Sequence, residues 1–118
     1  MQQALDTLAG EPIEIFVVWL PAIPSDRYEA TEYATKIIHD ERARHYWDGS
    51  QALGEALAPA MGMNAKLAWD VYVVFGKDAK WNDTPPVPAS WLHQKFGEDE
   101  SLQLSEEKLV SRIREALN

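Results

Sequence analysis

Apolar and polar residues alternate along the chain in patterns that predict four strands. Residues 13–20, IEIFVVWL, begin by alternating and then become apolar on both faces, which predicts a strand in the middle of a sheet. Residues 67–75, LAWDVYVVF, form a second such run that only Asp70 interrupts. The more polar segment 43–47, ARHYW, predicts a short strand at or near a sheet edge. After a glycine-containing turn, residues 79–81 are expected to return as a short fourth strand.

Apolar residues at helical spacing, each set preceded by a serine, predict three helices. Ser25 is a suitable N-cap for a helix over 26–39. Ser50 precedes a second helix, which Pro59 should bend or shorten. Ser105 caps a last helix that has acidic residues in its first turn and arginines toward its end, as the helix dipole favours.

The order of these elements predicts one α/β domain over residues 1–118. A right-handed crossover makes the first two strands parallel, and a hairpin then pairs the third strand with the fourth. The expected result is a four-stranded mixed sheet of order 2-1-3-4 with helices on both faces. Residues 1–11 are an N-terminal extension whose start is a short helix or a loose end, and residues 82–104 are a long Pro-rich and acidic loop. This loop is either a lid or partner-binding surface or a passive loop, and in both cases Trp91 should be buried.

Composition and charge exclude several classes of function. The chain has 118 residues, 46% of them hydrophobic, and no cysteine, so it forms no disulfide, thiolate nucleophile, cysteine-ligated zinc site or iron–sulfur cluster. A net charge of −8 without a basic patch argues against nucleic-acid binding. The longest apolar run is far shorter than a membrane span and the N-terminus does not look like a signal peptide, so we expect a cytoplasmic protein without membrane contact.

Three segments together give the chain, over about residues 12–118, a resemblance to the thioredoxin-like superfamily. FVVWLPAIPSDR is similar in pattern to that superfamily's central strand and the start of its first helix. VYVVFGKDAKW is similar to its later strand, turn and return strand, and SEEKLVSRIREALN is similar to its closing helix. The resemblance implies a three-layer sandwich with the sheet order given above.

The chain departs from that superfamily at the positions where its chemistry resides. The turn that would carry the paired cysteines reads Ile23, Pro24, Ser25, Asp26, and Ala68 and Trp69 stand where the superfamily has a cis-proline. Since thiol–disulfide exchange needs a thiolate, this chain does not catalyse it.

One edge of the predicted sheet gathers the candidate site residues. Ligands of open α/β sheets bind outside such strand ends. Aromatic and acidic side chains there would form a pocket for an apolar or cationic ligand; the residues are Trp19, Pro24, Ser25, Asp26, Trp47, Asp48, Trp69 and Asp70. The alternative is that the tryptophans pack the core and the acidic residues cap turns. The three histidines lack metal-ligand spacing, so we expect neither a metal site nor a cofactor.

Two functions are consistent with these patterns. The first is a non-redox, thioredoxin-like binding or interaction domain whose partner is a small molecule or a protein, with a homodimer through the loop or an exposed strand as one form. The second is a small enzyme that uses Asp26, His45, Asp48 and Asp70 for acid–base catalysis. The sequence leaves open whether the protein is an enzyme.

Overall fold

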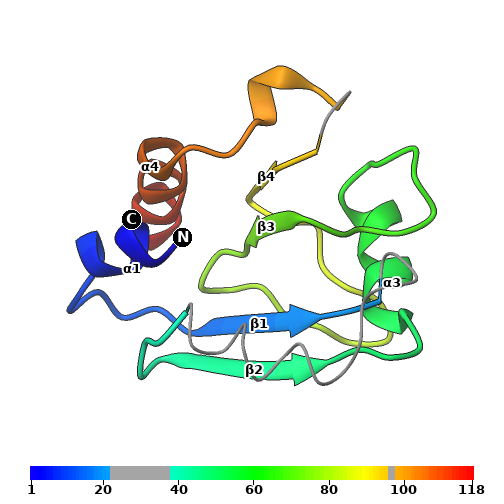
Figure 1. Cartoon of the computed structure of the whole chain (residues 1–118), viewed down its shortest axis with the longest axis horizontal. Coiled ribbons are helices and arrows are strands. Elements are labelled where there is room, and N and C mark those ends of the chain that lie inside the picture. Colours follow the sequence, from blue (N-terminus) through cyan, green and yellow to red (C-terminus); the bar gives the residue numbers. More distant parts are fainter. Residues whose placement is uncertain (22–37, 96–97) are drawn as a thin grey trace. The chain divides into compact units, whose positions relative to one another are not determined.

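The computed structural model describes residues 1–21, 38–95 and 98–118 (Figure 1). Contacts divide the chain into two compact units, Met1–Ala52 and Leu53–Asn118. The helix predicted over 26–39 lies almost wholly outside the described residues. The prediction of a single domain stays a prediction.

The first unit combines a short helix with a pair of parallel strands. Helix α1 is Gln2–Thr7, strand β1 is Ile15–Trp19 and strand β2 is Ala43–Trp47. The two strands are parallel and in register from Ile15 opposite Ala43 to Trp19 opposite Trp47. Both the predicted parallel pairing and the predicted bounds of the second strand are confirmed. The first strand is shorter than predicted.

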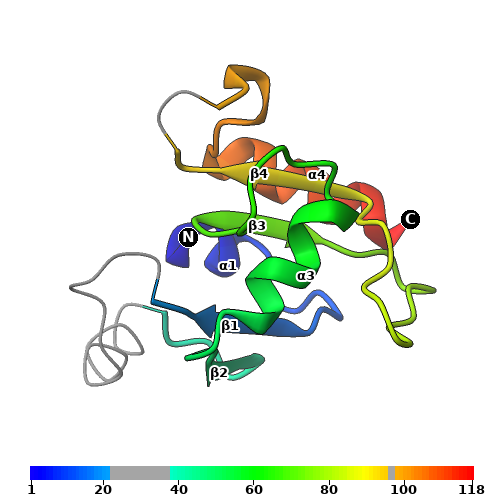
Figure 2. The ribbon, with the colours of Figure 1, turned by 90° about the vertical axis from the view of Figure 1, so that its right-hand side faces the viewer.

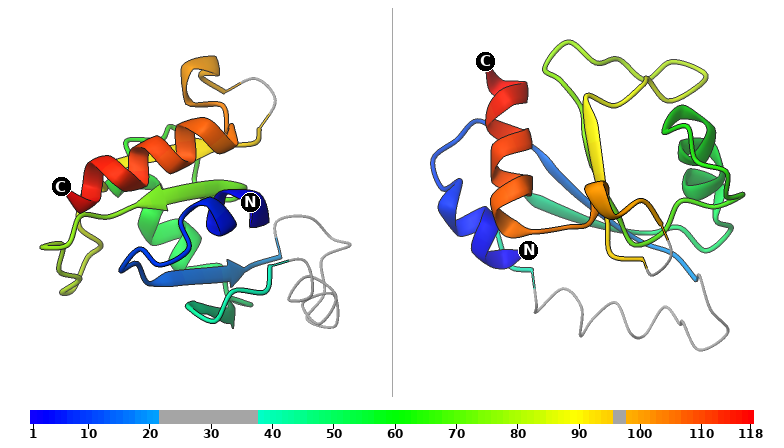
Figure 3. Two further views of the ribbon diagram at one scale, coloured as in Figure 1. Left: turned by 90° about the vertical axis from the view of Figure 1, so that its left-hand side faces the viewer. Right: turned by 90° about the horizontal axis from the view of Figure 1, so that it is seen from above.

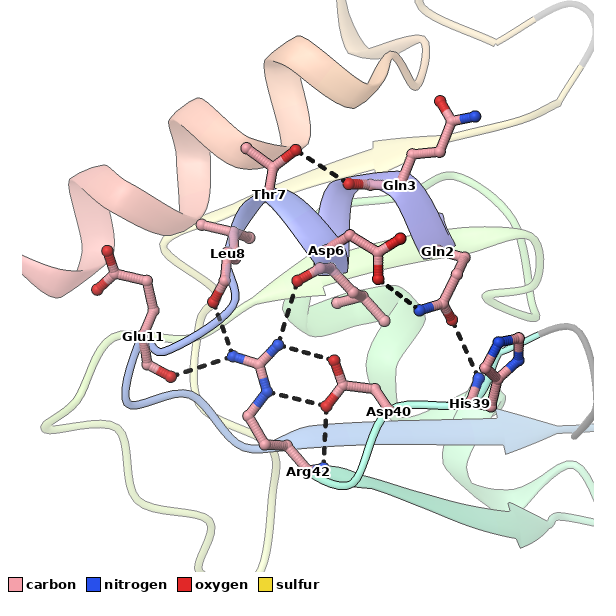
Figure 4. Close-up of polar contacts among 10 residues, drawn as sticks. Gln2, Gln3, Asp6, Thr7, Leu8, Glu11, His39, Asp40 and Arg42 are labelled. Carbon is pink, nitrogen blue, oxygen red and sulfur yellow. Dashed lines mark hydrogen bonds and ion pairs between the residues drawn. The ribbon is translucent and has the colours of Figure 1, made fainter.

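Arg42 joins the end of α1 to the start of β2 (Figure 4). Its Nε and Nη2 donate to the two carboxylate oxygens of Asp40 at 2.9 and 2.8 Å. Nη1 donates to the carbonyl oxygens of Leu8 and Glu11, and Nη2 also donates to that of Leu5, at 2.9, 3.1 and 3.2 Å. All five guanidinium N–H groups are therefore used. The carbonyl oxygens of Leu5, Leu8 and Glu11 also accept the backbone N–H groups of Leu8, Glu11 and Ile13, respectively, so Arg42 binds them as a second donor near the negative end of the helix dipole.

The carboxyl group of Asp40 in this pair is a stronger acid than an ordinary aspartic acid. Hydrogen bonds from the side chain and backbone N–H of Arg42, together with its charge, lower the pKa of Asp40 to about 2. The same pairing raises the pKa of Arg42. Both groups are charged at neutral pH, so the pair is a fixed part of the first unit.

The second unit is a two-stranded antiparallel sheet between two helices. Its elements are α3 (Ala52–Ala60), β3 (Val71–Val74), β4 (Ser90–His93), the 3-10 helix η1 (Glu100–Leu102) and α4 (Glu106–Leu117). Helix α3 lies against one face of β3 and β4, and α4 lies against the other (Figures 2 and 3). The cap predicted for the last helix is confirmed, because the Ser105 hydroxyl accepts the Lys108 N–H at 3.1 Å.

Strand alternation explains how both faces of this sheet are covered. Val73 lies opposite Trp91, and both pack with Val71 against a cluster of Ala58, Met61 and Ala68. Leu92, which follows Trp91 in β4, points to the other face of the sheet and is buried. Trp91 itself is only partly buried, whereas the prediction was a buried side chain.

The predicted four-stranded sheet of order 2-1-3-4 is wrong. Within the described residues β1 pairs only with β2, and β3 pairs only with β4, in two separate sheets. The segment 79–81 is not a strand, and the partner of β3 is Ser90–His93, inside the stretch predicted as a loop over 82–104. The physical reason is burial: 79–81 is exposed, whereas Ser90–His93 places apolar side chains on both faces of the sheet.

Candidate functional site

The carboxyl ends of the parallel strands bring together three of the predicted site residues. Trp19 and Trp47 are register partners, and the N–H of Asp48 donates to the carbonyl oxygen of Trp19 at 2.7 Å. The indole Nε1 of Trp19 also donates to Nδ1 of His45 at 3.3 Å, with the two rings tilted by only 6°. Pro24, Ser25 and Asp26 lie outside the described residues.

This hydrogen bond defines the state of the His45 ring. Since Nδ1 accepts the indole N–H, the proton of the neutral imidazole is on Nε2. The partner of Nδ1 is an indole and not a carboxylate, so the arrangement differs from the Asp–His pairing in which an acid orients a catalytic base.

The turn after β2 is shaped by a close approach. A Cβ at Gly49 would lie 2.8 Å from Nε1 of Trp47, so only glycine fits beneath that indole. Gln51 then adopts a positive φ of 64°, and its side-chain amide donates to the carbonyl oxygen of Pro21 at 2.6 Å. The turn thus ties the ends of both strands together.

The other two predicted site residues, Trp69 and Asp70, belong to the second unit. The Trp69 ring already has a cation on it, because Nζ of Lys95 lies 4.7 Å from its centroid. Asp70 adopts a positive φ of 51°, and its carbonyl oxygen accepts the N–H of Gln94 at 3.0 Å. The cation–π contact predicted for a ligand is therefore made within the chain.

Tyr72 adds a further hydrogen bond to Gln94, the residue that bonds to Asp70. Its hydroxyl donates to the side-chain oxygen of Gln94. Burial, and then the negative charge of Asp70, raise the pKa of Tyr72 above its usual value. At neutral pH the phenol is protonated and acts as a hydrogen-bond donor.

His93 is a buried structural residue. It has no exposed surface, its Nδ1 accepts the N–H of Lys95 at 3.0 Å, and its Nε2 lies 2.7 Å from the carbonyl oxygen of Asp99. These partners require the proton on Nε2, which donates to Asp99. The Asp99 carboxylate accepts from the N–H and hydroxyl of Ser101 and has a lowered pKa, chiefly because of these bonds. His93 thereby links the end of β4 to η1.

Other chemistry is sparse among the described residues. No group of three or more histidine and acidic side chains there could hold a metal ion. A hollow of about 420 Å³ follows α4, lined by polar side chains of that helix alone: Ser105, Glu107, Lys108, Ser111, Arg112 and Glu115. No described helix is long and apolar enough to cross a bilayer.

One surface was missed by the sequence analysis, namely the face of β1 and β2 that carries Phe16, Arg44 and Tyr46, here called the aromatic face. Phe16 is 56% exposed and Tyr46 49% exposed, although their rings stack at 6.3 Å between centroids. Arg44 is exposed, and among the described residues its side chain makes no hydrogen bond or ion pair. The alternation within residues 43–47 indicates this exposed face of β2. The uniformly apolar segment 13–20 gave no such indication for the neighbouring strand β1.

Comparison with protein-family models, with curated proteins and with solved structures gave no match.

Proposed function

We propose that this protein is a non-redox interaction module that binds a protein partner through the aromatic face. The observation that carries the proposal is the stacked yet half-exposed pair Phe16 and Tyr46, with the exposed Arg44 beside Tyr46 in β2. Large apolar rings left in contact with water cost free energy that a partner recovers. Tyrosine, phenylalanine and arginine are the residue types enriched where proteins bind one another.

The titratable groups support a binding role better than an acid–base enzyme. The Nδ1 atom of His45 accepts the indole N–H of Trp19 and has no carboxylate partner that would orient the ring as a catalytic base. One face of the Trp69 ring already carries the ammonium group of Lys95, which competes there with a cationic small molecule. The thioredoxin-like resemblance and the cytoplasmic location remain predictions, since no comparison bears on either one.

Site-specific photo-crosslinking tests the proposal. The photoreactive residue p-benzoylphenylalanine would replace Tyr46 in the protein expressed in its native cells, with the same residue in place of Trp81 as a matched control. Trp81 is also half exposed, at 48%, but lies in the second unit. We expect a discrete protein adduct from position 46 that Arg44→Glu abolishes, and none from position 81. Equal labelling from both positions would refute the proposal.

A further inference from the structure

The outer edge of β2 carries backbone groups that β1 does not use. Two hydrogen bonds mark the beginning and the end of the ladder between the strands. The Ile15 N–H donates to the Arg42 carbonyl oxygen at 3.4 Å, and the Asp48 N–H donates to the Trp19 carbonyl oxygen at 2.7 Å. In a parallel pair only alternate residues of each strand bond to the other, so Arg44 and Tyr46 direct their backbone groups to β1. His45, between them, therefore directs its N–H and C=O to the outer edge.

The strand β2 has neither a proline nor a bulge at this edge. Among the described residues β2 pairs with β1 alone. Proteins usually protect such an edge with proline, a bulge, inward-pointing charges or a covering segment, because it can recruit another strand. Residues 43–47, ARHYW, form a regular strand without proline.

On these grounds, and resting on the proposed function, we propose that the partner at the aromatic face is a second copy of this chain. The β2 strands of the two copies pair antiparallel about a two-fold axis at His45. The N–H and C=O of His45 in each copy bond to those of His45 in the other, giving a four-stranded sheet with both β2 strands at its centre.

The side chains of β2 are complementary to themselves in this register. With His45 opposite its own copy, Arg44 of each chain lies opposite Tyr46 of the other, on the aromatic face. Directly opposed Cβ atoms in such pairs lie about 4.5–5.5 Å apart, which brings a guanidinium over the facing phenol ring. The same contact forms twice, and Phe16 stacks on Tyr46 behind it. Arg44, which has no hydrogen bond or ion pair within the described residues, thus gains a partner.

The net charge of the chain affects how strongly two copies are expected to associate. Each copy carries −8, so the copies repel one another at long range, whereas the contacts at β2 are short-ranged. A short strand pair with two cation–π contacts is a small interface, for which a dissociation constant on the order of 10 µM is appropriate. Raising the salt concentration from 0.05 to 0.5 M should tighten the dimer about threefold or more, by screening the repulsion.

Sedimentation equilibrium of the intact protein between about 1 and 300 µM tests the self-pairing. We expect the wild type to dimerise and Arg44→Glu to raise the dissociation constant tenfold or more. Lys80→Glu, the matched control, makes the same change of net charge on an exposed loop of the second unit and should stay within twofold of wild type.

Hydrogen exchange of the wild type locates the interface without any substitution. The amide of His45 should exchange about sixfold more slowly at 300 µM than at 3 µM, because it is bonded only in the dimer and a dissociation constant of about 10 µM lowers the monomer fraction by that factor. A monomer at all concentrations, equal effects of the two substitutions, or an His45 amide indifferent to concentration would each overturn the proposal. If the protein stays monomeric while position 46 still crosslinks specifically to a different protein, the self-pairing fails and the proposed function stands. If neither occurs, both fail.

Discussion

The five-donor contact of Arg42 makes the first unit sensitive to a substitution that preserves charge. In Arg42→Lys the single ammonium group can keep Asp40 and one carbonyl, but it cannot also reach the other two carbonyls of Leu5, Leu8 and Glu11. Helix α1 is only six residues long, so it depends on contacts outside itself, namely the burial of Leu5 and Leu8 and the hydrogen bonds from Arg42.

The magnitude follows from the bonds that are lost. A hydrogen bond to a charged group contributes about 1.5–3 kcal/mol, and partial access of water to this site reduces each contribution to about 1–1.5 kcal/mol. Losing two of them should cost about 2–3 kcal/mol in the free energy of unfolding, out of a total of about 5–15 kcal/mol. For a chain of this length the melting temperature should fall by about 8–12 °C.

Urea denaturation and native-state hydrogen exchange measure this loss. We expect a lower midpoint, and amide exchange in α1 about 30- to 150-fold faster than in wild type. Arg44→Lys is the matched control: the same change two residues along, at an exposed side chain, should alter stability by less than about 0.5 kcal/mol. If Arg42→Lys is as stable as this control and α1 exchanges as in wild type, the guanidinium does not hold the helix and the reasoning is refuted.

Three further outcomes are expected. Asp40 has a folded-state pKa of about 2, below its unfolded value, so its stabilisation is complete above about pH 5 and is lost as pH falls through 2. The deficit of Asp40→Asn, about 1 kcal/mol in urea titrations at pH 7, should therefore shrink to a small fraction of that value at pH 2. Gly49→Ala should displace the Trp47 indole, shift its NMR Nε1–H resonance and lower stability by about 1 kcal/mol; an unmoved resonance would argue against the close approach. His93→Ala should cost about 2–4 kcal/mol on thermal unfolding, and ¹⁵N spectra of the wild type should show the proton on Nε2; an Nδ1–H ring would contradict the bonding described.

Elements that rest on local signals were predictable from the sequence. The last helix has its cap, its acidic first turn and its apolar spacing within residues 105–117, and the structure forms it as Glu106–Leu117. The strand over 43–47 matches its predicted bounds, and its parallel pairing with β1 follows from the long connection between the two. Each of these needed only neighbouring residues or the length of a connection.

The partner of β3 could not be predicted in this way, because it depends on competition between distant segments. The turn at Gly76 favoured a hairpin with 79–81, the nearest sequence. The structure instead places three prolines and an extended connection before Ser90–His93, whose Leu92 and His93 are both buried. Loop closure costs little more for a longer connection, whereas burying an apolar side chain such as Leu92 contributes about 1.5–3 kcal/mol, so burial decides the pairing.

The two neighbouring arginines show why the site was harder to predict than the fold. Arg42 and Arg44 are the same residue type, two positions apart, so residue type and charge do not distinguish their roles. Arg42 follows Asp40 closely and meets carbonyls contributed from more than thirty residues away, so its donors are exhausted inside the unit. Arg44 lies within the strand, where alternation directs its side chain to the exposed aromatic face beside Tyr46. A guanidinium with all five donors bonded cannot also recognise a partner, so the proposed binding depends on Arg44. A substitution of Arg44 should therefore change association while leaving stability nearly unchanged.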